Sequence, residues 1–358
     1  MKISLFYLPG YWPEQHGSVG NLYANILREV EFGERNGFHG VWFAEHHFFR
    51  YGGVIPSVPV LATAAAMRTR RLRIGASIAQ LPLSDPIRVA EEFAMLDVLS
   101  SGRLDFGIGR AFERAEYEAF NVPMGESRSR FEEAHEIILR AWTEERVTYP
   151  GRYRTLRDVA VLPKPAQKPL PPIYVACMFS ERSFRWAGRQ GYNLMYVPYV
   201  SSVAESRQRI GWYREALAGA GHDPASRDIV LPFHFFCGES HAHARDYPRR
   251  FLSNYFVLAA EANQADADAG EYPDYAGLGS IFTSLQSDYD YMYPSRVIFG
   301  DPEECVERIK AAADLGARHV ALLTNFGGMP HGQIMRSLER FAKYAMPRIG
   351  TLAGRGIP

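Results

Sequence analysis

The chain has 358 residues, and its 40 basic and 40 acidic side chains leave the formal net charge close to zero. This balance argues against nucleic acid or an acidic membrane surface as a partner. The length fits one large α/β domain with insertions, or two medium-sized domains.

The cysteine content and the apolar segments predict a cytoplasmic protein. The three cysteines, Cys177, Cys237 and Cys305, are far apart and odd in number, so a disulfide framework is not expected and a reducing compartment fits. No apolar segment reaches transmembrane length. The apolar run 2–8 is too short for a signal peptide and is interpreted as a first strand.

Eight short apolar segments are predicted as strands, and helices separate them. The predicted strands are 2–8, 40–43, 72–78, 104–108, 173–176, 193–197, 229–236 and 319–323. The predicted helices are 18–35, 57–69, 85–99, 127–142, 181–189, 203–218, 241–260, one that begins near 301, and 333–344. Such an alternation favours a closed (β/α)8 TIM barrel over an open doubly wound sheet.

Two segments interrupt this alternation. Residues 151–154 and 159–163 are predicted as the strands of a short hairpin insertion near 150–170. Residues 261–295 are acidic and rich in Gly and Tyr without a clear period, which suits a mobile lid better than a core element. The prediction is one domain over residues 1–358 that carries both insertions.

Ionisable residues come directly after the second predicted strand, in the order Glu45-His46-His47. Catalytic groups of parallel barrels lie at this C-terminal end of the strands. Neighbouring residues on an extended segment point in opposite directions, and no third ligand has zinc-like spacing, so no metal site is predicted. Two interpretations stay open: one imidazole acts in a cavity as acid or base, or two histidines cap a barrel layer.

Three further strand ends carry residues suited to a flat, phosphorylated ligand. Small residues around Ser77 would let a planar ring lie against the backbone, although they also suit packing inside the barrel. Arg110 and Arg128 could clamp a phosphate or could be surface arginines. Ser180 and Ser183 open a predicted helix, where Ser180 could act as a simple cap or both hydroxyls could bind phosphate.

Aromatic residues gather in three further segments, 192–199, 233–236 and 289–293. They could line an apolar substrate cavity, and the alternative is ordinary core, which is favoured for the first two.

The segment Trp42–Phe48 resembles the Glu-His-His-Phe segment of bacterial luciferase and its flavin-dependent monooxygenase relatives. The resemblance continues, in the same order, over nearly the whole chain. It runs through 81–88, 96–97, 101–103, 106–110, 127–128, 175–176, Ser180, Ser183, 300–302 and 316–317.

This resemblance implies a barrel with an insertion that packs as a homodimer. It also implies reduced FMN (FMNH2) as cofactor, supplied by a separate NAD(P)H:flavin reductase, and O2 as co-substrate. A flavin 4a-hydroperoxide would then oxygenate a small or medium-sized organic substrate. The site would be shielded from water, and residues 261–295 could form the closing loop.

By position, the resemblance implies roles for individual residues. His46 matches the catalytic histidine, with His47 as its partner and Glu45 and Glu116 in the same catalytic group. Ser77 and Ile78 match a non-prolyl cis peptide beneath the flavin ring. The remaining residues assigned to the cofactor are Gly109, Arg110, Phe112, Arg128, Phe179, Ser180 and Ser183, among which the two arginines and two serines would hold the phosphate.

One residue departs from the family pattern, since Gly109 stands where luciferase has a reactive cysteine. Light emission and aldehyde chemistry are therefore not implied. The substrate stays open, as does the choice between hydroxylation, Baeyer–Villiger insertion and oxidative cleavage. Two alternative functions are a deazaflavin-dependent hydride-transfer oxidoreductase and a non-catalytic flavin-binding subunit.

Overall fold

The computed structural model describes residues 1–263, 275 and 277–350. Its centre is a closed barrel of eight parallel strands, as predicted, in which each strand pairs with two neighbours and β9 pairs with β10 to close the ring. The strands are β1 (Lys2–Tyr7), β2 (Gly40–Phe43), β3 (Arg73–Ala76), β5 (Leu104–Gly109), β8 (Ile173–Cys177), β9 (Asn193–Tyr196), β10 (Ile229–Cys237) and β12 (His319–Leu323).

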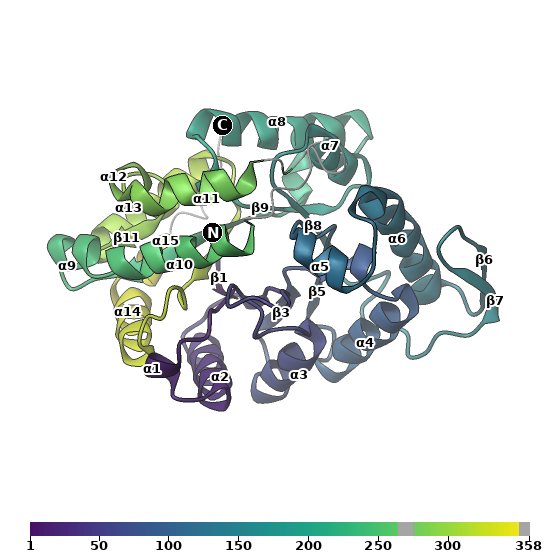
Figure 1. Ribbon diagram of the computed structural model, residues 1–358, viewed down its shortest axis with the longest axis horizontal. Helices are drawn as coiled ribbons and strands as arrows, with labels where there is room; N and C mark the ends of the chain where they lie inside the picture. The colour runs from purple at the N-terminus through teal and green to yellow at the C-terminus, as the bar shows by residue number, and fades with distance from the viewer. Residues whose placement is uncertain (264–274, 276, 351–358) are drawn as a thin grey trace.

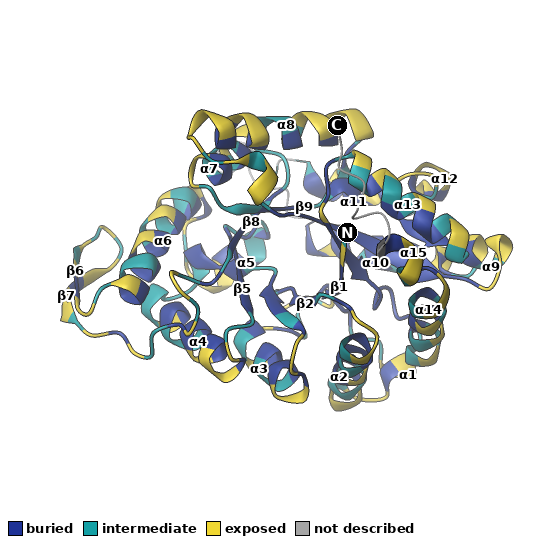
Figure 2. Ribbon diagram, turned by 180° about the vertical axis from the view of Figure 1, so that it is seen from behind, coloured by how far each residue is buried: buried dark blue, intermediate teal, exposed yellow. Residues whose placement is uncertain are grey.

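Helices surround the barrel (Figure 1) and turn their apolar faces toward it, so that exposed positions lie on the outer rim (Figure 2). They are α2 (Val19–Arg35), α3 (Val58–Arg68), α4 (Pro86–Leu99), α6 (Ser127–Thr143), α7 (Glu181–Arg189), α8 (Val203–Gly219), α13 (Pro302–Asp314) and α14 (His331–Tyr344). The side chains of Ser18, Asp85 and Asp301 each accept a backbone N–H at the start of their helix, which explains the sharp starts that the sequence predicts. Among the described helices, none is both long enough and apolar enough to cross a membrane.

The insertion after α6 is an antiparallel hairpin of β6 (Val147–Pro150) and β7 (Thr155–Val159). Both predicted strand positions are wrong: 151–154 is the turn, and the second strand ends at Val159, where the predicted strand 159–163 would begin. The Glu133 carboxylate on α6 accepts the backbone N–H groups of Arg152, Tyr153 and Arg154 at 2.7 to 2.9 Å, and it thereby bends the chain.

The predicted helix 241–260 is two helices, α9 (His241–Asp246) and α10 (Arg249–Ala262), because Pro248 interrupts it. The next segment contains α11 (Leu278–Ser287) and α12 (Tyr289–Met292). Phe282 and Leu285 are buried, and α11 packs against α10, so the prediction that 261–295 has no core element is wrong for 278–292. The rest of the predicted lid, 264–274 and 276, lies outside the described residues.

One short strand was not predicted, β11 (Ile298–Gly300), which pairs in parallel with β10 outside the eight-strand ring. The third barrel strand ends earlier than predicted, at Ala76. A two-residue strand, β4 (Ala79–Gln80), then pairs with the end of β5, so the chain crosses the rim of the barrel between them.

Candidate active site

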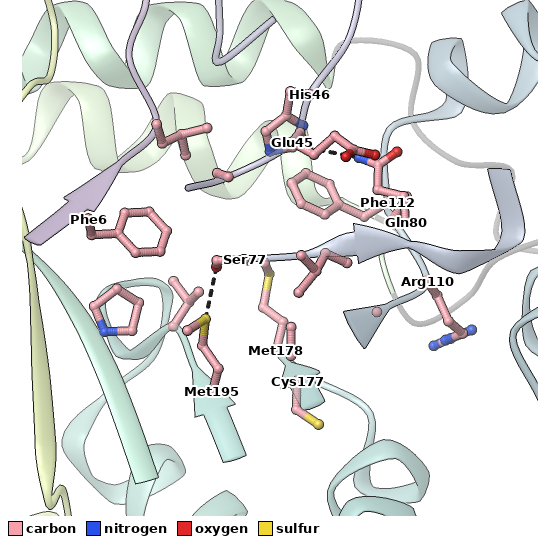
Figure 3. Close-up of a pocket in the computed structure, with 18 of the residues that line it drawn as sticks. Phe6, Glu45, His46, Ser77, Gln80, Arg110, Phe112, Cys177, Met178 and Met195 are labelled. Carbon is pink, nitrogen blue, oxygen red and sulfur yellow. Dashed lines mark hydrogen bonds between the residues drawn. The ribbon is translucent and has the colours of Figure 1, made fainter. Parts of the chain in front are cut away.

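A cavity of about 850 Å³ opens at the C-terminal ends of the barrel strands (Figure 3). Most of its wall is apolar: Phe6, Leu8, Ala44, Ile78, Ala111, Phe112, Ala176, Met178, Met195, Val197, Pro232 and Leu323. The polar groups on the wall come from the segments after β2, β3, β5, β8 and β9. Seven of the residues predicted for the site line this wall: Glu45, His46, Ser77, Ile78, Gly109, Arg110 and Phe112.

His46 is buried between two carboxylates. Its Nδ1 lies 3.4 Å from Glu113 Oε1 and 3.4 Å from Glu116 Oε1, and only 7% of the residue is exposed. Burial alone would lower the pKa of His46, but the charges and hydrogen bonds of Glu113 and Glu116 together raise it to about 10. The imidazole is therefore protonated at neutral pH.

The two carboxylates come from the start of a short helix, α5 (Arg114–Ala119). Glu116 is held in place because Oε1 accepts the backbone N–H of His47 at 2.8 Å and Oε2 accepts Gln80 Nε2 at 3.0 Å. Burial raises the pKa of Glu113 to about 6, against the opposing charge of His46. Sequence reasoning found Glu116 but missed Glu113 and Gln80, although residues three apart on a helix share one face.

One atom from each of His46, Glu113 and Glu116 lies within 4.8 Å of the others, a spacing that could hold a metal ion. The sequence showed no third ligand because Glu113 and Glu116 stand almost 70 residues after His46. A protonated imidazole between the two carboxylates already offsets one of their two negative charges without an ion. The absence of a metal therefore stays a prediction.

The structure brings His46 to the cavity but not the ring of His47. The His47 ring packs edge-on against Phe120, with centroids 4.9 Å apart, and its Nε2 lies 3.7 Å from Glu45 Oε1. Of the two carboxylates beside His46, His47 contacts only Glu116, through its backbone N–H. The two histidines point in opposite directions, as expected for neighbours on an extended segment.

Two arginines and two serines form a second polar group beside the cavity. Arg110 Nη1 lies 3.4 Å from Ser127 Oγ, and Arg128 Nη2 lies 3.5 Å from Ser183 Oγ. Burial raises the pKa of the Cys177 thiol to about 12, against the opposing charges of Arg110 and Arg128. In Figure 3, Arg110 lies at the opposite end of the view from Phe6.

Ser180 lies at the start of α7 but does not use its hydroxyl to cap that helix. The plain-cap interpretation of Ser180 is therefore wrong, and its hydroxyl stays next to the first turn that carries Ser183. A helix start with hydroxyls and nearby guanidinium groups suits an anion.

The peptide bond between Ser77 and Ile78 is cis, as the resemblance implied. The Ser77 hydroxyl contacts Met195 Sδ at 2.8 Å across the cavity (Figure 3). Ile78 also explains Gly109, because a Cβ at position 109 would lie 2.2 Å from Ile78 Cδ1. The cysteine found in luciferase would not fit here unless Ile78 moved.

Two aromatic residues assigned to the cofactor are placed differently. Phe112 lines the cavity, stacks on Tyr275 with centroids 5.8 Å apart, and meets the His46 ring edge-on at 5.6 Å. Phe179 does not line the cavity and packs beneath the Arg209 guanidinium, 5.2 Å from the ring centroid. Its ring centroid lies 5.9 Å from that of Tyr275, which does line the cavity.

Replacing Glu113 with Gln should lower the pKa of His46, because it removes a negative charge that stabilises the imidazolium. The expected decrease is roughly 1 to 3 pH units, measured by an NMR pH titration of the histidine ring nitrogens. Glu118→Gln, an exposed position on the same helix, is the control and should leave the titration unchanged. An unaltered His46 titration in Glu113→Gln would contradict this electrostatic account.

Comparison with known proteins places this site in a family context. Residues 1–319 match the luciferase-like monooxygenase family. The oxygenase component of the flavin-dependent trigonelline monooxygenase of Acinetobacter baylyi is 27% identical over 342 residues, which cover 91% of this chain and 89% of that protein. The crystal structure of monooxygenase RslO1 from Streptomyces bottropensis aligns with a TM-score of 0.84 at 31% identity, covering 97% of this chain and 99% of that one.

The same fold also occurs with a different cofactor. An F420-dependent secondary alcohol dehydrogenase, solved with an F420–acetone adduct, aligns with a TM-score of 0.76 at 19% identity, covering 97% of this chain and 98% of that one. At this identity the likeness concerns the fold alone.

Proposed function

We propose, on the premise that this chain belongs to the luciferase-like monooxygenase family, that it is the oxygenase component of a two-component FMNH2-dependent monooxygenase. The observation that carries the proposal is that one apolar cavity is lined both by a protonated His46 and by Arg110, which belongs to a cationic group with hydroxyl neighbours. A separate reductase would supply the reduced flavin, which is supported by the similarity to a protein described as an oxygenase component.

The residues around the cavity suit FMN. Arg110 and Arg128, with Ser180 and Ser183, would hold the phosphate through charge-assisted hydrogen bonds. The buried Gln80 Oε1 has no hydrogen-bond partner within the described part of the chain, so it offers an acceptor to a ring N–H. When bound, reduced FMN would supply the oxygen-activating chemistry, through a flavin 4a-hydroperoxide.

His46 would move a proton at the reacting oxygen. Its Nδ1 faces Glu113 and Glu116, and the second N–H of an imidazolium is at Nε2. The two carboxylates would restore the charged form after each transfer, because they favour the imidazolium. The apolar wall would keep water from the reacting groups and would accept a small or medium-sized organic substrate.

A deazaflavin-dependent hydride transfer is the second candidate, favoured by the fold shared with the F420-dependent alcohol dehydrogenase. Deazaflavin reacts poorly with O2, so reaction of the reduced cofactor complex with O2 separates the two. Rapid oxygen chemistry on bound FMNH2 supports the monooxygenase, and hydride transfer to a carbonyl compound without oxygen uptake supports the alternative.

We also propose that the chain forms a homodimer through α3 and α4. These neighbouring helices expose large apolar side chains: Val60 (72%), Met67 (61%), Met95 (50%), Val98 (46%) and Leu99 (44%). Exposed large apolar side chains on two neighbouring helices suit an interface.

The double substitution Val60→Asp and Met67→Asp should shift the dimer toward monomer, raising the dissociation constant roughly 100-fold or more, because interface centres are desolvated. Sedimentation velocity measures it. Leu162→Asp, an exposed apolar position on the chain segment after β7, is the control and should leave the dimer intact. A monomeric wild-type protein at micromolar concentration would overturn the proposal.

A further inference from the structure

Three tyrosines meet at one wall of the cavity. The Tyr255 hydroxyl on α10 lies 2.9 Å from the Tyr51 hydroxyl and 3.0 Å from the Tyr199 hydroxyl. Tyr51 belongs to the loop after β2, and Tyr199 to a short 3-10 helix, η3 (Pro198–Val200), after β9. Tyr51 and Tyr199 line the cavity, whereas Tyr255 lies behind them. The three residues are almost fully buried, so they form a built cluster, not a chance surface contact.

The cluster has one more proton than its two hydrogen bonds to Tyr255 use. Three hydroxyls carry three protons, and the third proton lies on Tyr51 or Tyr199, whose hydroxyls also interact with each other and can turn it toward an acceptor in the cavity. If Tyr255 accepts from one neighbour and donates to the other, the third O–H belongs to Tyr51 or Tyr199, and both residues line the cavity. Burial raises the pKa of Tyr199 to about 12 and the pKa of Tyr51 and Tyr255 well above their usual value, so all three hydroxyls keep their protons.

The residues around the cluster limit which kind of ligand can accept a hydrogen bond from this O–H. Among the described residues that line the cavity, only Glu45, His46 and Arg110 carry charge at neutral pH. The histidine behind the cluster, His234, has its pKa lowered to about 3 by burial, so it is neutral; its ring lies 4.3 Å from that of Tyr255. The nearby wall is apolar, formed by Leu8, Val197, Pro232 and Leu323.

The cluster also lies next to the catalytic histidine. The rings of Tyr51 and His46 are 5.3 Å apart. An acceptor oxygen held by the tyrosines would therefore place the atoms bonded to it beside His46. A substrate without such an acceptor oxygen would leave a buried O–H without a hydrogen-bond partner. The site would therefore bind it less tightly than a substrate that has the oxygen.

We propose that the Tyr51–Tyr255–Tyr199 cluster binds the carbonyl oxygen of a neutral, otherwise apolar substrate, a ketone or quinone, and orients it toward His46. The inference rests on the proposed function for the reaction that follows binding. The binding of the carbonyl compound itself can be measured without any reaction. It names the substrate class: a carbonyl compound without a carboxylate or ammonium group.

The test compares three probes of similar size: 1-tetralone, which has the carbonyl; tetralin, the matched hydrocarbon; and 1-naphthoate, which is anionic. Ligand-observed NMR titrations use the full chain with saturating oxidised FMN. The expected result is that the ketone binds about tenfold more tightly than the hydrocarbon, the size of one net hydrogen bond. The anion should bind more weakly than the ketone.

In the double variant Tyr51→Phe and Tyr199→Phe, the preference for the ketone should fall to within about twofold, while hydrocarbon binding stays unchanged. Tyr213→Phe is the matched control, because its buried hydroxyl donates to the Tyr192 carbonyl and does not line the cavity; it should keep the preference. If the double variant does not fold, the single variants Tyr51→Phe and Tyr199→Phe replace it, and one of them should lose most of the preference.

The inference is overturned if the wild-type protein binds ketone and hydrocarbon equally, if it binds none of the probes, if the anion binds best, or if the preference survives in the Phe variants. Reaction of the reduced FMN complex with O2 needs no organic substrate. It therefore reports separately on the proposed function, and a failed probe series beside a normal oxygen reaction would reject the substrate class alone.

Discussion

Replacing Arg110 with Ala should weaken the binding of both FMN and FMNH2 by roughly 30-fold or more. The guanidinium lies next to Ser127 Oγ, so a phosphate bound there would meet a positive charge and a hydroxyl group. Loss of one member of a desolvated charge pair costs roughly 2 to 5 kcal/mol, and each 1.4 kcal/mol is a factor of about ten. Equilibrium dialysis or flavin fluorescence measures the dissociation constant, under anaerobic conditions for the reduced form.

The control for this substitution is Arg146→Ala. Arg146 lies before the hairpin and pairs with Asp158 at the surface, so its loss removes the same charge from the protein without touching the cavity. It should leave FMN binding within about twofold of wild type, since exposed ion pairs contribute little. If Arg110→Ala and Arg146→Ala bind FMN equally well, the phosphate does not lie where we place it. Riboflavin, which lacks the phosphate, should bind equally to both.

Replacing His46 with Asn should reduce substrate turnover by roughly 100-fold or more, the usual contribution of a positioned acid or base. The protonated ring is the only histidine side chain on the cavity wall among the described residues. FMN binding should be retained because the arginines and serines are unchanged. Oxygen consumption should continue while product formation falls, so the ratio of product to hydrogen peroxide is the informative measurement.

His47→Gln is the comparison that makes this prediction specific. Its ring packs against Phe120 outside the cavity, and its backbone N–H, which Glu116 accepts, is kept in the variant. The expected loss of turnover is less than about tenfold. If His46→Asn and His47→Gln lose turnover equally, the position of each ring relative to the cavity does not explain what each histidine does.

The location of the site could be predicted from the sequence because it depends on local patterns. Each apolar strand is short and uninterrupted, and the residues directly after each strand must lie at one end of a parallel barrel. His46, Ser77, Arg110 and Ser180 could therefore be grouped from the sequence alone. The cis peptide and the phosphate residues came from the resemblance, since no periodic pattern marks them.

The residues that sequence reasoning missed are those whose position depends on distant partners. Glu113 lies before a six-residue helix, which is too short to show a helical period. The Tyr51–Tyr255 contact joins residues 204 positions apart. The turn at 151–154 is imposed by Glu133, on a helix that looks complete without it.

One error was avoidable from the sequence. Leu278, Phe282 and Leu285 have the i, i+4, i+7 spacing of a helix that buries one face, and they pack α11 against α10. The pattern was missed because the whole segment 261–295 was judged by its composition, which the acidic and glycine-rich residues before Leu278 dominate. Since α10 carries Tyr255, the packing of α11 against it supports the tyrosine wall of the cavity.

The central claim is that this chain uses reduced FMN to activate oxygen, and stopped-flow spectroscopy tests it most directly. The protein is mixed with photoreduced FMN and then with O2, without substrate, and the absorbance is recorded from milliseconds to minutes. We expect an oxygenated flavin species that persists far longer than the oxidation time of free FMNH2. Return of oxidised FMN at the rate seen without protein would contradict the claim.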